Sequence, residues 1–145
     1  MACALALGPA RVQAQADFSY SPVSPGSWSY NATPSGSEAA FMDGTGTRRV
    51  VVSCMRSTRQ VSISRASPAP AATVNVWTSS TSRALPSRFE QAVQRVTATT
   101  TAYDPLLDAV AFSRGRFALS LPGSPTLVVP TAPEVDHVVE DCRAA

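Results

Sequence analysis

The chain has 145 residues, of which 44% are hydrophobic and 15% are charged, and its formal net charge is +2. This length suits one domain that buries about two thirds of the surface of its unfolded chain. The sequence holds no run near twenty apolar residues, which excludes a membrane-spanning helix. A net charge this small indicates that the protein has no broad basic face of the kind that binds duplex nucleic acids. We therefore expect neither a membrane span nor a nucleic-acid partner.

The first residues have the composition of an export signal. They are apolar and end in Ala-Gln-Ala at 14–16, small residues spaced as signal peptidase requires. We expect residues 1–16 to be a truncated secretion signal with its true start codon upstream, 17–27 to be a flexible lead-in, and 28–145 to form a single β-rich domain. A lipid anchor at Cys3 is a weaker alternative, because two residues cannot supply the apolar segment that precedes a lipidated cysteine.

Removal of the signal leaves two cysteines, Cys54 and Cys142, at positions where the apolar pattern predicts burial. In an exported chain this pair predicts a disulfide and a periplasmic or secreted protein. Two unconnected buried thiols are the alternative. A catalytic thiol is disfavoured, because the single histidine, His137, is predicted on the solvent face of the helix whose core face carries Cys142.

Alternation of apolar and polar residues predicts a series of strands in the first half of the chain. These strands are expected at Trp28 to Tyr30, 39–42, 49–55, Val61 to Ile63 and Val74 to Val76. Within the strongest of them, 49–55, the inward face is Val50, Val52 and Cys54. Residues 79–87 are polar and predict an irregular loop.

The stretch 88–103 is ambiguous. A stripe of apolar residues at helical spacing runs through it, while 96–101 is rich in β-branched side chains that disfavour a helix. We favour a strand over 94–102.

A short helix and a hairpin follow. Asp104 suits a helix N-cap and the next residue is proline, which the first turn accepts, so a helix is expected near 105–112. The segments 116–121 and 126–129 flank a Pro-Gly turn and predict a hairpin.

The end of the chain predicts a second helix, near 132–142. Thr131 and Glu134 have the capping-box spacing, in which hydroxyl and carboxylate bond backbone N–H groups. The inward stripe of this helix is Val135, Val138, Val139 and Cys142. Six to eight strands with two helices predict a mainly β fold, an antiparallel β-sandwich or open barrel with the last helix packed on the sheet.

All twelve basic residues are arginines, a bias that a GC-rich genome explains. Seven of them fall between 48 and 88, where no acid occurs, while the C-terminal helix carries four acids. The arginines either form an anion-binding face or pair with those acids. We select four as candidates for binding an anion or a partner, namely Arg56 and Arg59 in a predicted turn and Arg114 and Arg116 on either side of a glycine.

The sequence offers little for catalysis. It lacks Gly-x-Ser-x-Gly, and one histidine cannot supply a zinc site of several imidazoles. His137 and Asp141 have the spacing of a surface ion pair on a helix. Asp104 and Asp108 have structural roles at a helix start. We therefore predict no catalytic residue, no metal and no cofactor.

Two motifs resemble known proteins. The run DPLLDAVAFSRGRF at 104–117 and the tetrapeptide EDCR at 140–143 resemble uncharacterised small exported proteins of Gram-negative bacteria, mostly alphaproteobacteria. More remotely, a tryptophan strand, a cysteine strand and a closing hairpin with a helix look like the invasion-associated locus B family. That resemblance implies a periplasmic β-sandwich without known catalysis.

We therefore expect a non-catalytic periplasmic or envelope-associated binding protein, whose partner is an envelope protein or an anionic envelope component. The alternatives are an inhibitor of a periplasmic hydrolase and an enzyme with a dispersed site. The sequence leaves the oligomeric state open.

Overall fold

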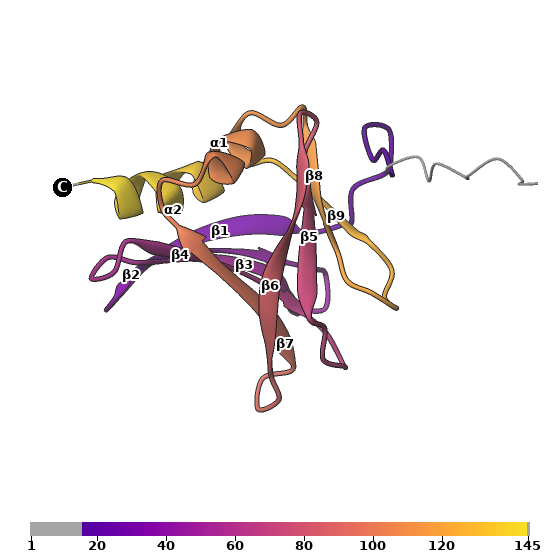
Figure 1. Ribbon diagram of the computed structural model, residues 1–145, viewed down its shortest axis with the longest axis horizontal. Helices are drawn as coiled ribbons and strands as arrows, with labels where there is room; N and C mark the ends of the chain where they lie inside the picture. The colour runs from indigo at the N-terminus through magenta and orange to yellow at the C-terminus, as the bar shows by residue number, and fades with distance from the viewer. Residues whose placement is uncertain (1–15, 145) are drawn as a thin grey trace, which may run out of the picture.

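A computed structural model describes residues 16–144, so the predicted secretion signal lies, except for Ala16, outside the described residues. The described part is mainly β, with nine antiparallel strands in one curled sheet and two helices (Figure 1). In chain order the elements are β1 (Ser27–Thr33), β2 (Gly36–Met42), β3 (Arg48–Met55), β4 (Gln60–Ala66), β5 (Thr73–Trp77), β6 (Ser82–Glu90), β7 (Arg95–Thr101), α1 (Pro105–Ala111), β8 (Arg116–Ser120), β9 (Leu127–Pro130) and α2 (Pro133–Arg143).

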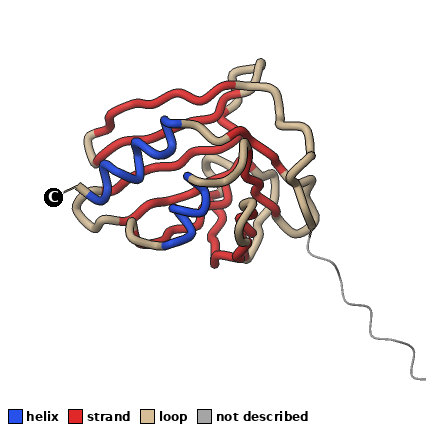
Figure 2. The backbone as a smooth tube through the Cα atoms, turned by 90° about the horizontal axis from the view of Figure 1, so that it is seen from above, coloured by secondary structure: helices blue, strands red, loops and turns tan. Residues whose placement is uncertain are grey.

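The strands follow the order β1-β2-β3-β4-β7-β6-β5-β8-β9, and every neighbouring pair is antiparallel. The first four strands are consecutive, the next three run back toward β4, and the last hairpin adds to β5. The sheet curls into a half-barrel, and both helices lie inside the curl (Figures 1 and 2). The predicted mainly β, open-barrel architecture is confirmed. Neither helix of the described part is long and apolar enough to cross a membrane.

The core lies between the concave face of the sheet and α2. Its members on β3 and β4 alternate along each strand, as the sequence pattern predicts. The predicted inward stripe of the C-terminal helix is also confirmed, since Val135, Val138, Val139 and Cys142 are buried. Cys54 and Cys142 form the predicted disulfide, with an S–S distance of 2.01 Å. This bond joins the end of β3 to the end of α2.

Trp28 connects the two ends of the curled sheet. Its indole Nε1 on β1 donates to the carbonyl of Pro130 on β9 at 2.9 Å. Its ring packs on Phe41 and Phe117, with centroids 5.4 and 6.1 Å away. The first and last strands, which are not paired through their backbones, therefore meet through one side chain.

The lead-in of residues 17–27 contacts the final hairpin, although it was expected to be flexible. Ser24 donates its backbone N–H to the Val128 carbonyl at 2.8 Å, and the Phe18 ring meets Trp77 edge-on at 5.5 Å. Up to Gly26 it forms no helix or strand.

Two local predictions and the expected number of strands are wrong. Strand β6 (Ser82–Glu90) begins inside the stretch 79–87, which was predicted as an irregular loop, because hydrogen bonds to β5 and β7 hold it although it has almost no apolar face of its own. That strand raises the number of strands to nine. The capping box at Thr131 does not form: α2 is N-capped by Ala132 without a side-chain bond, since the Thr131 N–H extends the hairpin by bonding to Gly115.

The N-cap of α1 is confirmed and is reinforced from the sheet. Asp104 accepts from the Leu106 N–H at 2.9 Å, from the Thr100 hydroxyl at 2.5 Å and from the guanidinium of Arg83. These donors, with Arg83 the strongest, lower the pKa of Asp104 from 3.8 to about 2, against the opposing effect of burial. Asp104 therefore has a structural role, in line with the sequence analysis.

Asp104→Asn is expected to lower the free energy of unfolding by about 2 kcal/mol at pH 7. Because folding lowers the pKa of this carboxyl, its contribution is complete above about pH 4 and disappears as the pH falls toward 2. Urea denaturation of both proteins at neutral pH and near pH 2 measures the difference. A gap between variant and wild type that stays constant with pH would contradict this assignment.

Candidate functional site: an arginine pocket

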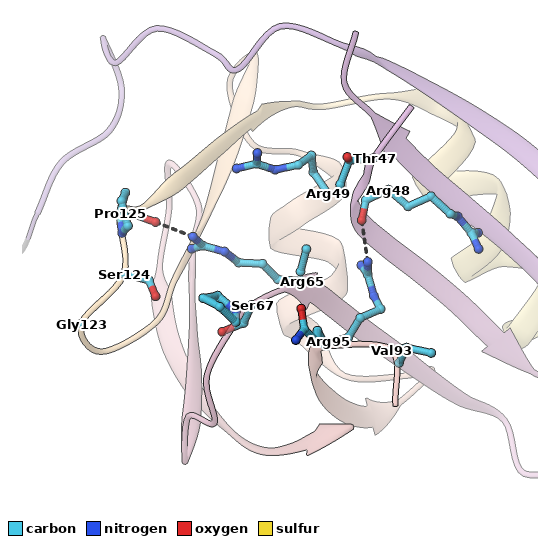
Figure 3. Close-up of a pocket in the computed structure, with 13 residues that line it drawn as sticks. Thr47, Arg48, Arg49, Arg65, Ser67, Val93, Arg95, Gly123, Ser124 and Pro125 are labelled. Atoms are coloured by element: carbon cyan, nitrogen blue, oxygen red, sulfur yellow. Dashed lines mark hydrogen bonds between the residues drawn. The ribbon is translucent and has the colours of Figure 1, made fainter. Parts of the chain in front are cut away.

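A cavity of about 640 Å³ lies where the β2–β3, β4–β5, β6–β7 and β8–β9 loops meet (Figure 3). Its charged lining consists of arginines alone. We define the arginine pocket by these four side chains: Arg48, Arg49, Arg65 and Arg95.

Arg65 lies at a position of β4 where the alternation of inward and outward side chains predicts an apolar core residue. It follows Val61 and Ile63 on the inward face of β4 and is only 5% exposed. Its two terminal nitrogens donate to the carbonyls of Leu119 at 2.6 Å and Pro125 at 2.5 Å, across the open end of the half-barrel. Its Nε is buried without a hydrogen-bond partner, and no carboxylate of the described part lies within 4.0 Å.

Arg95 reaches the same region from the start of β7. Its Nε bonds the Ser64 hydroxyl at 3.0 Å, and its terminal nitrogens bond the carbonyls of Arg48 and Ser64. Like Arg65, it is held by neutral acceptors and forms no ion pair within the described part of the chain. Both guanidinium groups are therefore fixed in position, and neither has a carboxylate within 4.0 Å.

A shift in the register between β2 and β3 sets the directions in which the side chains of Arg48 and Arg49 point. Phe41 pairs with Val50 and Met42 with Arg48, which leaves Arg49 without a partner on β2. Such bulges change the direction of side chains at strand ends. Figure 3 shows Arg49 extending with Arg65 toward the β8–β9 hairpin, whereas Arg48 points away.

The carboxylates near these two arginines hold them unequally. Arg48 lies 2.6 Å from Glu38, a close ion pair, while Arg49 lies 3.7 Å from Asp43. Both arginine side chains are more than 40% exposed. Arg49 is thus the most available donor of the arginine pocket.

The positive charges of the pocket repel one another. Burial lowers the pKa of Arg65, and the charge of Arg49 lowers it further. Burial likewise lowers the pKa of Arg95, Arg48 lowers it further, and Glu90 partly opposes the shift. Arginine nevertheless stays protonated in proteins. Because Arg65 and Arg95 have no carboxylate within 4.0 Å, the charges of the pocket provide an attraction for an external anion.

The four arginines selected from the sequence lie elsewhere. Arg56 is exposed and 4.0 Å from Asp141, and Arg59 donates to the Tyr103 hydroxyl at 2.9 Å and to the Arg143 carbonyl at 3.1 Å. Both therefore lie beside the end of α2. One of the pairings expected with the acids of the C-terminal helix, that of Arg56, is present.

Arg114 and Arg116 lie just after α1, in the turn that leads into β8 and at the first residue of that strand. The Arg114 backbone N–H bonds the Ser79 hydroxyl at 3.0 Å while its side chain is exposed. Arg116 donates to the Ser21 carbonyl and holds the lead-in. The two predicted pairs of arginines are thus not brought together, and neither pair lines the arginine pocket.

A second polar cluster surrounds the histidine. The rings of Tyr30 and His137 stack at 3.9 Å, the Tyr30 hydroxyl donates to Asp141 at 2.5 Å, and His137 Nε2 lies 3.7 Å from Asp141. The i, i+4 contact between His137 and Asp141 that the spacing predicts is present. Within residues 16–144, no three metal-ligating side chains lie close enough to hold an ion.

Comparison of the chain with protein-family models, with curated proteins and with solved structures gives no match. The resemblance to the invasion-associated locus B family therefore stays a prediction from the sequence.

Proposed function

We propose that the protein is a non-catalytic binding protein that holds an anionic component of the bacterial envelope in the arginine pocket. Arg65 carries this proposal. A guanidinium that is 5% exposed and has only carbonyl partners is costly to keep charged, and an anion at the pocket mouth would offset that cost.

The chemistry of the pocket favours binding over catalysis. Its ionisable groups are guanidinium groups, which donate hydrogen bonds but neither accept a proton nor attack a substrate at neutral pH. Four such groups are typical of sites that recognise carboxylates or phosphates.

A periplasmic or secreted location is part of the proposal. The disulfide between Cys54 and Cys142 supports it, because such bonds persist mainly in oxidising compartments. The signal predicted at 1–16 would supply the export route. Intact mass of the protein expressed with an added upstream start codon tests this: a mature form beginning at Asp17 supports export, and an uncleaved chain with free thiols contradicts it.

Arg49→Gln is expected to weaken the binding of inorganic phosphate at least tenfold, because a charge-assisted hydrogen bond contributes about 1.5 to 3 kcal/mol. Arg49 is the available donor, and its exposed side chain makes a folding defect a minor concern. Isothermal titration calorimetry at low salt measures the affinity, and added sodium chloride should weaken it.

Arg88→Gln is the matched control, since Arg88 is an exposed arginine on β6 outside the pocket and its side chain is 78% exposed. Its affinity for phosphate should equal that of the wild type. If Arg49→Gln retains phosphate binding and Arg114→Gln loses it, the binding site is the turn after α1 and not the arginine pocket. Absence of binding by the wild type would overturn the proposed function.

A further inference from the structure

We propose that the ligand of the arginine pocket is a phosphate monoester of a sugar-like alcohol, a group that carries about two negative charges at neutral pH. This inference rests on the anion-binding function proposed above and specifies the chemical class of the anion. Three features support it: the charge balance, the division of donors, and the remaining lining of the cavity.

The charge balance calls for a dianion. Four guanidinium groups face two carboxylates within 4.0 Å, those of Glu38 and Asp43. Glu90 lies opposite Arg95 in the β6–β7 pairing and partly offsets its charge, but its ion pair is with Arg88, at 3.8 Å. Among the described residues, no carboxylate therefore lies within 4.0 Å of Arg65 or Arg95. A ligand with two negative charges neutralises the pocket, whereas a monoanion leaves one of these charges unbalanced.

The donors are divided between fixed and available groups. Each terminal nitrogen of Arg65 and each nitrogen of Arg95 already donates to one protein oxygen, so these two groups are held in place and keep only part of their five N–H donors for a ligand. Arg49, which lies 3.7 Å from its carboxylate, supplies the most available donors next to the Arg65 charge. Donors that converge from neighbouring guanidinium groups suit a compact anion with several acceptor oxygens, such as phosphate.

The rest of the cavity suits a polar, hydroxyl-bearing body. A volume of about 640 Å³ falls in the range of sites for small organic ligands and far exceeds a bare phosphate. Beyond the arginines the cavity is lined by the polar side chains of Thr47, Gln94 and Ser124 and by short apolar ones, among them Pro68 and Pro125. Polar groups next to small apolar surfaces match the hydroxyl edges and C–H faces of a sugar ring.

Titration calorimetry with a hexose monophosphate, the corresponding hexose monosulfate and inorganic phosphate tests this inference on the disulfide-bonded protein. At pH 7.5 the hexose phosphate should bind at least tenfold more tightly than the sulfate, which has the same shape and one charge. Because the second phosphate pKa lies near 6, this advantage should disappear at about pH 5. Arg49→Gln should lose it, and Arg88→Gln should keep it.

The outcomes separate the inference from the proposed function. Equal binding of hexose phosphate and hexose sulfate at pH 7.5 would overturn the dianion while leaving an anion-binding site. Inorganic phosphate binding as tightly as the hexose phosphate would overturn the sugar ester. No binding of any of the three would overturn both the inference and the proposed function.

The same chemical group occurs in soluble sugar phosphates and in the headgroups of phosphorylated glycolipids. Sedimentation of the protein with phosphatidylcholine vesicles, in which about one lipid in ten is a monophosphorylated glycolipid, distinguishes these sources. Sedimentation that free hexose phosphate competes away supports the headgroup. Binding of the free ester without sedimentation supports the soluble form, and sedimentation that persists in Arg49→Gln would overturn a role of the pocket in membrane attachment.

Discussion

Replacement of both cysteines by alanine is expected to lower the free energy of unfolding by about 4 to 5 kcal/mol. The disulfide closes a loop of 88 residues, and the chain-entropy model gives a loss of this size when such a link is removed from the unfolded state. A domain of this size has a total stability of roughly 5 to 15 kcal/mol, so the variant is left close to unfolding. Urea denaturation of wild type and variant measures the difference.

The reduced wild-type protein is the control for the cysteine variant. It has the same missing link but no change in side-chain volume, so its midpoint should match that of the variant closely. Because Val135, Val138 and Val139 are buried in the core, α2 should remain docked in the folded fraction without the bond. A loss below 1 kcal/mol in both proteins would contradict the entropic argument.

Trp28→Ala is expected to lower the free energy of unfolding by about 3 kcal/mol, near the lower end of the range for large aromatic residues because Trp28 is half-buried. The substitution removes the packing on Phe41 and Phe117 and the bond to the Pro130 carbonyl. These contacts connect the two ends of the curled sheet. Urea denaturation monitored by far-UV circular dichroism measures the loss.

Trp28→Phe separates the two contributions. It keeps an aromatic ring against Phe41 and Phe117 and removes the indole donor, so a loss of about 1 kcal/mol is expected. A loss as large as that of Trp28→Ala would assign the effect to the hydrogen bond instead. Hydrogen exchange at Val129 should be faster in Trp28→Ala than in Trp28→Phe, because β9 then loses its contact with β1.

Much of the fold could be predicted because its signals are local. The strand at 49–55 contains three consecutive valines, a β-branched run that favours a strand, and the N-cap at Asp104 depends on adjacent residues. Strand β6 could not be predicted, because only Leu85 of its nine residues is buried and Pro86 interrupts the pattern. Its conformation is imposed by neighbours that the sequence does not place. Thr131 failed as a cap for the same reason, since a contact with Gly115 competes for its position.

The arginine pocket could be predicted only in part. The high density of arginines between 48 and 88 indicated anion binding in this region, and three residues of the pocket come from it. Their convergence depends on the missing partner of Arg49 on β2 and on the pairing of β4 with the distant β7, which brings in Arg95. Both are tertiary features. An arginine at a core position of an alternating strand, as at Arg65, is the one local signal that could have identified the site.

The contact between Trp28 and Pro130 also has a consequence for folding kinetics. It joins residues 102 positions apart, and the β4–β7 pairing is itself non-local. Chains dominated by such distant contacts must lose loop entropy before they gain native interactions, and they fold in milliseconds to seconds rather than in microseconds. Because the two residues are so far apart in the chain, the half-barrel can close only after the segment through Pro130 has left the ribosome.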